Sequence, residues 1–235
     1  MGAAAAPPAA PAAAGGFVVD VSDFLEEFDE NAVAATGKYK GQEVTVTGTV
    51  KTIDFDFMDN PYIAITGGGM FEMNAVWCMI DDASQSAGLN SGDNVMVVGT
   101  FKEWDMLDVT LDNCSVVGAP AAPMAPAAPA AAGGFEVDAS DFLKEFEENA
   151  IVATGKYKGK EVTVTGTVET IDFDYWDNPY ISVTDGGMFT FRVVRCMIND
   201  ASQSAGLKSG DNVTVVGTFK EWNIFIGTLR NCSVK

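Results

Sequence analysis

The sequence predicts a mainly β protein with two tandem copies of one five-stranded barrel domain, each opened by a helix and preceded by an Ala/Pro-rich segment. Residues 17–117 align with residues 135–235 without a gap, and 73 of the 101 aligned positions are identical. The chain of 235 residues, 47% of them hydrophobic, is long enough for two domains of about 100 residues each. We therefore divide it into an N-terminal arm (1–16), a first domain (17–117), a linker (118–134) and a second domain (135–235).

Each repeat begins with a helix. In the first copy Asp20 or Ser22 can cap its start, and apolar residues recur at helical spacing from Phe24 onward. We expect this helix to end at Gly37, because glycine favours the left-handed conformation that commonly follows a helix.

Five strands follow the helix. Residues 43–55 alternate apolar and polar side chains and are rich in β-branched residues, which predicts a strand that runs into the turn Asp59-Asn60-Pro61. We expect two further strands at 62–66 and 71–80, a short helix at 82–89, and the last two strands at 95–104 and 107–116. Five strands with a helix between the third and the fourth are the plan of the OB-fold, a small Greek-key barrel.

The second copy also resembles a known family. The resemblance is carried by Lys156–Val168, the strand around Cys196, Gly206–Val213 and Leu229–Cys232. These segments look like the tRNA_anti-like group of bacterial OB-fold proteins, and the resemblance covers almost all of each repeat but not the linkers. Members of that family are often exported or lipid-anchored, so the resemblance implies an extracellular or cell-surface protein. The family name implies nucleic acid through distant anticodon-binding relatives.

Charge and composition limit the function. The net charge is −19 and the pI is about 4.1, so the field around the protein repels phosphate backbones and nucleic acid is not the expected partner. The sequence holds no histidine, which removes the usual general base and the Ser-His and Cys-His nucleophiles, and we do not expect an enzyme. It also holds no run of about 18 apolar residues that could span a membrane.

The two copies differ in charge. The first has four basic and 18 acidic residues, a net charge of −14, whereas the second has 10 and 15, a net charge of −5. Asp112 corresponds to Arg230 and Trp77 to Arg195. The difference indicates that the copies face different neighbours, with drift on solvated surfaces as the alternative.

Each copy has two cysteines that are 36 residues apart, Cys78 with Cys114 and Cys196 with Cys232. One cysteine lies in the expected third strand and the other in the fifth, and these strands are neighbours in an OB barrel. A disulfide within each domain is therefore possible and would imply an oxidising compartment. Buried free thiols are the alternative, because cysteine is also common in cores.

One acidic and aromatic stretch occurs in both copies, at Thr52–Tyr62 and as TIDFDYWDNPY at Thr170–Tyr180. Strand alternation predicts that Ile171, Phe173 and Tyr175 face the core while the aspartates face outward. Three carboxylates per copy could then hold Ca²⁺, the only cofactor that we consider. The alternative is a solvated acidic face and a plain turn. The candidate ligands are Asp54, Asp56 and Asp59, and Asp172, Asp174 and Asp177.

Two functional hypotheses follow. The first is a non-catalytic, exported structural protein whose copies assemble head to tail into an extracellular filament, with the arm (1–16) of one chain docked on a domain of the next. It rests on the order of the repeat, because the chain starts with an Ala/Pro segment and ends on a domain.

The second hypothesis is a surface or periplasmic binding module that uses a barrel face for a small ligand, an oligosaccharide or nucleic acid. Its platform would lie in the second domain, because the first domain lacks the arginines of this platform and has Glu72, Asn74 and Trp77 at related strand positions. The platform residues are Phe189, Phe191, Arg192 and Arg195.

Overall fold

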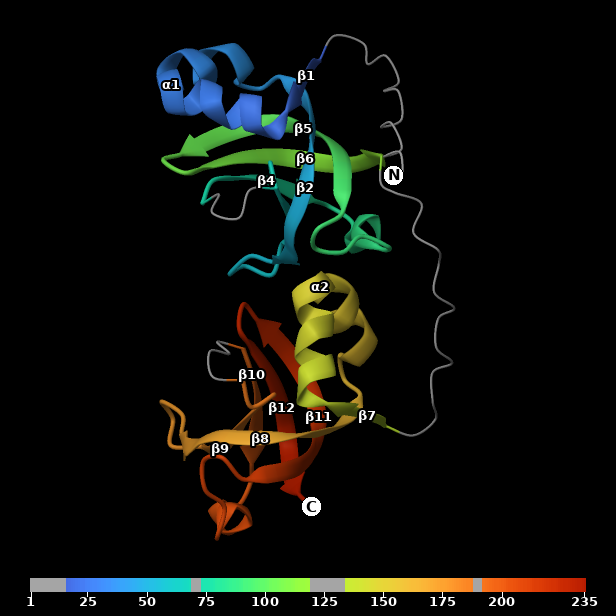
Figure 1. Ribbon diagram of the computed structural model, residues 1–235, viewed down its shortest axis with the longest axis vertical. Helices are drawn as coiled ribbons and strands as arrows, with labels where there is room; N and C mark the ends of the chain where they lie inside the picture. Colours follow the sequence, from blue (N-terminus) through green and yellow to red (C-terminus); the bar gives the residue numbers. More distant parts are fainter. Residues whose placement is uncertain (1–15, 69–72, 119–133, 188–191) are drawn as a thin grey trace, which may run out of the picture.

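Two closed five-stranded barrels in tandem, each with a helix in front, make up the computed structural model (Figure 1). The structure describes residues 16–68, 73–118, 134–187 and 192–235. The elements of the first domain are β1 (Phe17–Asp20), α1 (Val21–Tyr39), β2 (Glu43–Phe55), β3 (Pro61–Thr66), β4 (Ala75–Ile80), the 3₁₀ helix η1 (Ala83–Ser86), β5 (Asn94–Asp105) and β6 (Asp108–Gly118). The elements of the second domain are β7 (Phe135–Asp138), α2 (Ala139–Tyr157), β8 (Glu161–Phe173), β9 (Pro179–Thr184), β10 (Val193–Ile198), η2 (Ala201–Ser204), β11 (Asn212–Asn223) and β12 (Ile226–Val234).

The sheet topology confirms the predicted OB-fold. The first sheet has the order β1-β2-β3-β4-β6-β5, and β2 also pairs with β5, which closes the barrel. The second sheet has the same connections, with β8 and β11 closing it. The short strands β1 and β7, which pair in parallel with β2 and β8 at the start of each domain, were not expected from the sequence.

The helices are longer than predicted, and both are bent. Gly37 lies inside α1, which ends at Tyr39, and the left-handed residue that follows is Gly41, with φ of 69°. Asn31 has non-helical dihedrals (φ −158°, ψ 82°), and Asn149 in α2 has almost the same values (φ −159°, ψ 93°). Asparagine competes with helical hydrogen bonding and favours cap positions, which explains why both helices bend there. We call residues 31–34 and 149–152 the elbows of α1 and α2.

Aromatic side chains fix each helix over its barrel. In α1, Phe24 and Phe28 are buried against Tyr39, and Phe28 stacks on Phe101 of β5 at 5.4 Å between ring centroids. The second domain repeats this cluster with Phe142, Phe146, Tyr157 and Phe219.

The cysteines pair as predicted. Cys78 of β4 is bonded to Cys114 of β6, and Cys196 of β10 to Cys232 of β12, with Cα–Cα distances of 5.6 and 5.7 Å. The joined strands are parallel neighbours in each sheet, so each disulfide links two non-consecutive strands within one barrel. The alternative of buried free thiols is thereby excluded.

In the described part of the chain, neither helix is both long and apolar enough to cross a membrane.

Candidate functional site: the domain contact and the barrel faces

The elbow of α2 docks on the first domain. The Asn149 side chain is 4% exposed, and its Nδ2 donates hydrogen bonds to the backbone oxygens of Ser86 (2.9 Å) and Leu89 (2.8 Å). The backbone N–H of Ser91 donates in return to the oxygen of Glu148 at 3.0 Å. Figure 1 shows α2 directly beneath the first barrel, facing the end of β2.

Apolar packing accompanies these bonds. Ile151 of α2 is 5% exposed and belongs to the hydrophobic core of the first domain, together with Leu89 and Ile53. One domain contributes a helix elbow and the other contributes the loop after η1 and the end of β2. Because the two surfaces differ, the contact is heterologous and has a direction.

Asp54, a candidate calcium ligand, lies in this contact and not on an outward face. It is 7% exposed, and burial raises the pKa of its carboxyl group, against the effect of the hydrogen bond from its neighbour Phe55 N at 2.8 Å. The Trp222 indole N–H and the Arg192 guanidinium of the second domain also act to lower this pKa. The indole lies near the carboxylate but does not reach hydrogen-bonding geometry. The prediction of an outward Asp54 was wrong because the second domain covers it.

Four of the other candidate ligands form the turn after the first barrel strand, and Asp172 lies within β8. Asp174 Oδ1 accepts from Trp176 N and Asn178 N, both at 2.9 Å, and the bonds from Asn178 lower the pKa of Asp174. Asp56 makes the equivalent bonds to Asn60 N and Met58 N at 2.8 Å.

Asp59 and Asp177 occupy left-handed turn positions (φ 63° and 62°), and Asp172 is exposed. Among the described residues no three acidic or cysteine side chains gather into a possible metal site. The structure therefore favours the plain turn and gives the calcium prediction no support.

The side chains of the repeated stretch that were predicted to face the core do so only in part: Ile171 and, in the first copy, Phe55 pack against the cores of their domains, but the prediction was wrong for Phe173 and Tyr175. Phe173 is 56% exposed, Tyr175 92% and Trp176 77%. The strand ends at Phe173, so its alternation no longer applies to Tyr175 in the following turn. Among the apolar residues of β2 and β8 in this stretch, Ile53 of the first copy is fully buried, because Ile151 of the second domain packs in the same cluster.

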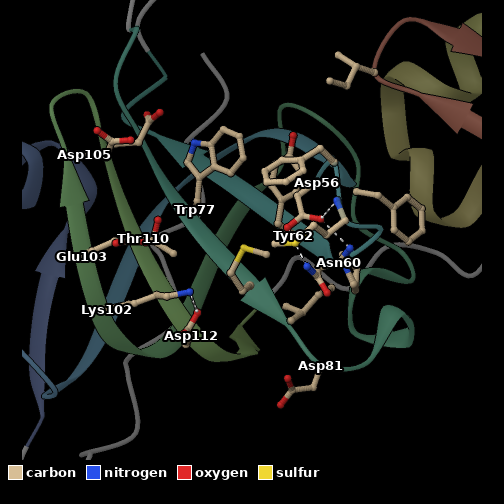
Figure 2. Close-up of a pocket in the computed structure, with 18 residues that line it drawn as sticks. Asp56, Asn60, Tyr62, Trp77, Asp81, Lys102, Glu103, Asp105, Thr110 and Asp112 are labelled. Carbon is tan, nitrogen blue, oxygen red and sulfur yellow. Dashed lines mark hydrogen bonds and ion pairs between the residues drawn. The ribbon is translucent and has the colours of Figure 1, made fainter.

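An open groove of about 870 Å³ runs along the barrel face of the first domain. Tyr62 of β3 and Trp77 of β4 stack in it at 4.5 Å, and burial raises the pKa of Tyr62 to about 12 (Figure 2). Ile224 of the second domain reaches its rim. Lys102 bonds to Asp112 at 3.4 Å and is outnumbered by acids; those that line the groove are Asp56, Asp81, Glu103, Asp105, Asp108 and Asp112.

The equivalent face of the second domain has a different charge. Arg195 replaces Trp77, and its guanidinium lies over the Tyr180 ring at 4.5 Å. Arg230 replaces Asp112, and the other exchanges remove acids: Asp81 becomes Asn199, Asp105 becomes Asn223 and Asp108 becomes Ile226. The uneven charge noted in the sequence is thus concentrated on one face.

The predicted platform is only partly assembled. Phe189 and Phe191 lie outside the described residues. Arg192 forms an ion pair with Glu147 of α2 at 2.9 Å, and therefore belongs to the side of the domain that meets the first barrel. Arg195 alone lies on the face.

Sequence reasoning missed the docking residues Asn149, Ile151, Ser86 and Leu89. The one available signal was an asparagine in the middle of a strongly helical segment, followed by a β-branched apolar residue on its outer side. The two backbone carbonyls that Asn149 binds have no signature in the sequence, because any residue supplies a carbonyl.

The two closed barrels, each with a helix in front, define tandem OB-fold domains. The chain belongs to the tRNA_anti-like family, which it matches over residues 2–116 and again over residues 115–234. The resemblance found in the sequence is thereby confirmed. A search among curated protein sequences gave no match.

Similarity was also found among solved structures. A lipoprotein of Klebsiella pneumoniae subsp. pneumoniae MGH 78578 with a proposed nucleic-acid-binding role is 23% identical, over 43% of this chain and 92% of that one, with a TM-score of 0.37. A Leishmania major Friedlin protein assigned as an aspartyl-tRNA synthetase is 11% identical, over 49% of this chain and 23% of that one (TM-score 0.31). A murine DNA-binding protein bound to double-stranded DNA is 8% identical, over 81% and 94% (TM-score 0.25). At such low identities and TM-scores these structures carry no argument about function.

Proposed function

We propose that this is a non-catalytic, exported structural protein whose copies associate head to tail. One observation carries the proposal: the contact between the two domains is directional, and both domains possess both of its surfaces. The second domain docks its elbow on the end of the first domain that is formed by the loop after η1 and the end of β2, which we call the loop end. Within the described residues, no other domain covers the elbow of α1 or the loop end of the second domain.

A directional contact between equivalent domains propagates. If the second domain of one copy receives the first domain of another, each addition leaves the same two surfaces uncovered at the ends. Such an assembly grows into a filament unless its rotation closes a ring.

The arm (1–16) supports the same arrangement. It stands before the first domain as the linker stands before the second, with the same Ala-Ala-Gly-Gly-Phe at its end. In the assembly it would stand between the second domain of one copy and the first domain of the next, as the linker stands between the two domains in the sequence. Residues 1–15 and 119–133 are outside the described residues, so the docking of the arm remains an expectation from the sequence.

Export is supported by the two disulfides, which persist in oxidising compartments. A non-catalytic role is supported by the lack of histidine and by the use of Asp56 and Asp174 as turn caps.

Sedimentation velocity over a wide range of protein concentration, together with negative-stain electron microscopy, tests the proposal. We expect the sedimentation coefficient to rise with concentration and linear particles to form. Removal of residues 2–16 should weaken assembly if the arm contributes. A chain that stays monomeric at every concentration, with and without Ca²⁺, would refute head-to-tail assembly.

A second candidate function is the binding of single-stranded nucleic acid by the face of the second domain. The Arg195–Tyr180 stack favours it, because a cation beside a half-buried aromatic ring can hold a phosphate while the open part of the ring stacks on a base. Arg230 adds a positive charge where the first domain has Asp112.

Titration of a labelled oligonucleotide at two salt concentrations tests this candidate. Arg230→Asp installs the residue of the first domain and should weaken binding and reduce its dependence on salt. Lys144→Glu makes the same change in charge on α2 with the residue that the first domain has there, and should have little effect. Equal effects of the two variants would show that only net charge matters, and would remove the case for a site on this face.

A further inference from the structure

We infer that the elbow of α1 docks into the loop end of the second domain of another copy, and thereby repeats between chains the contact that α2 makes within the chain. We call residues 204–209 together with Ile171 and Asp172 the tail surface. The inference rests on the proposed head-to-tail assembly and specifies its two surfaces and its partner, a second copy of this chain.

The elbow of α1 already has the docked conformation. Its bend at Asn31 matches the bend at Asn149 in both dihedrals to within about ten degrees. Asn31 Oδ1 accepts from Ala34 N at 3.0 Å, as Asn149 Oδ1 accepts from Val152 N at 3.0 Å. The side-chain oxygen is therefore used locally in both helices, and the amide Nδ2 is the group left for a partner. No rearrangement is needed before docking.

The tail surface is also preformed. Leu207 N donates to Ser204 O at 3.1 Å, as Leu89 N donates to Ser86 O at 3.0 Å. The next backbone N–H is held by an aspartate in both loops, Lys208 N by Asp211 and its counterpart in the first domain, each at 2.8 Å. The carbonyls of Ser204 and Leu207 are thus held as in the loop that receives Asn149.

Exposure shows that both surfaces lack cover in the described structure. Val33 of the α1 elbow is 86% exposed, whereas its counterpart Ile151 is 5% exposed. Leu207 is half-buried, whereas Leu89 is 2% exposed. Asn31 is exposed as well. An exposed β-branched residue beside an exposed amide donor is the arrangement that docking covers in the other half of the molecule.

The expected contact follows from the internal one. Asn31 Nδ2 of one copy donates to Ser204 O and Leu207 O of the next, Ser209 N donates to Glu30 O, and Val33 packs on Leu207. The residues at these positions are identical between the repeats except for valine in place of isoleucine.

Two changes lie beside the contact: Lys208 replaces Asn90 and Glu169 replaces Lys51, so the net charge of this pair falls from +1 in the first domain to zero in the second. The expected contact between copies is weaker than the contact within the chain for two other reasons. Valine is smaller than isoleucine, and the contact between copies lacks the linker, which raises the effective concentration of the internal contact to roughly the millimolar range. Each chain also carries −19, so copies repel one another at low salt. We therefore expect assembly at high protein concentration that added salt strengthens.

Three variants with the same change in charge test the inference. Asn31→Asp keeps the oxygen that caps Ala34 N but replaces the amide donor with a carboxylate facing two carbonyl oxygens. The helix therefore folds, but the elbow of α1, which we call the head, is blocked. Leu207→Asp blocks the tail. Val18→Glu installs the residue that the second domain has at Glu136, on a valine that is 58% exposed and outside both surfaces, and serves as the control.

Sedimentation velocity should show that Val18→Glu elongates as the natural sequence does, while each blocked variant alone stays monomeric. A mixture of Asn31→Asp and Leu207→Asp should form dimers and nothing larger, because the first retains a working tail and the second a working head. The mixture also reports folding, since a misfolded variant could not pair.

The outcomes separate the inference from the proposed function. If the natural sequence assembles and Asn31→Asp assembles equally well, head-to-tail assembly stands and the elbow contact is wrong. If both variants block assembly but their mixture stays monomeric, the surfaces are not complementary and the inference is also wrong. If the natural sequence never assembles, both proposals fail.

Discussion

Replacement of Asn149 by alanine measures how strongly the two domains are coupled. The Asn149 side chain accepts one bond, from Val152 N, and donates two, to Ser86 O and Leu89 O. Loss of a helix cap costs about 1 kcal/mol. Each of the two buried bonds to the first domain contributes about 1 kcal/mol net. We therefore expect Asn149→Ala to lower the free energy of unfolding by about 3 kcal/mol.

The repeat supplies the control. Asn31 caps α1 in the same way but has no bond to another domain within the described residues, so Asn31→Ala should cost only about 1 kcal/mol. The expected difference of about 2 kcal/mol corresponds to a factor of roughly 30 in the equilibrium constant for domain contact.

Urea unfolding followed by tryptophan fluorescence provides the assay, because Trp222 lies at the contact and is 7% exposed. It should be carried out at low protein concentration, where copies are dissociated. If the two variants lose the same stability, the bonds across the domain contact contribute nothing and the reasoning is refuted.

Three further predictions concern stability. Burial raises the pKa of Asp54 above 3.8, so its ionised form destabilises the fold as the pH rises past that value. Asp54→Asn should therefore raise the melting temperature at neutral pH, and this gain should disappear below about pH 3.8. The gain should be larger than that of Asp172→Asn, because Asp172, the counterpart in the second domain, is exposed. Gly48→Ala should cost about 1–3 kcal/mol in urea unfolding, because its Cβ would lie 2.6 Å from a Val21 methyl group, whereas Gly37→Ala, with nothing within 4 Å of its Cβ, should stabilise α1 by up to about 1 kcal/mol; the opposite order would contradict the packing. Replacing either cysteine pair by alanine should lower stability by about 2–4 kcal/mol, and equal melting with and without reductant would show that the bonds are not formed in solution.

Much of the fold could be predicted because it depends on local patterns. The alternation of residues 43–55 gave β2, and the cysteine spacing of 36 residues gave two disulfides that the structure confirms. The end of α1 was predicted too early, because Gly37 is open to solvent and its cost inside a helix is offset by the burial of Tyr39 two residues later.

The candidate sites were harder to predict, because they depend on contacts between distant segments. Asp54 and Asp172 have identical local sequences, yet one is buried and the other exposed. Their exposure differs because the second domain covers Asp54 of the first barrel, whereas no other domain covers Asp172 in the described structure. Tyr175 was placed in the core by an alternation that holds only while the strand continues, and the strand ends at Phe173.

The sequence by itself determined the tandem repeat, the OB-fold of each copy and the uneven charge, and it paired the cysteines as candidates for disulfides, because each of these is expressed in spacing, alternation or composition along one repeat. Only the tertiary structure decided that the elbow of α2 docks on the loop end of the first domain. That contact depends on a bent helix, two backbone carbonyls and an Ile151 that joins the hydrophobic core of the other domain. Backbone groups carry no residue-specific signal, so a directional contact between two nearly identical domains becomes visible only when they are placed side by side.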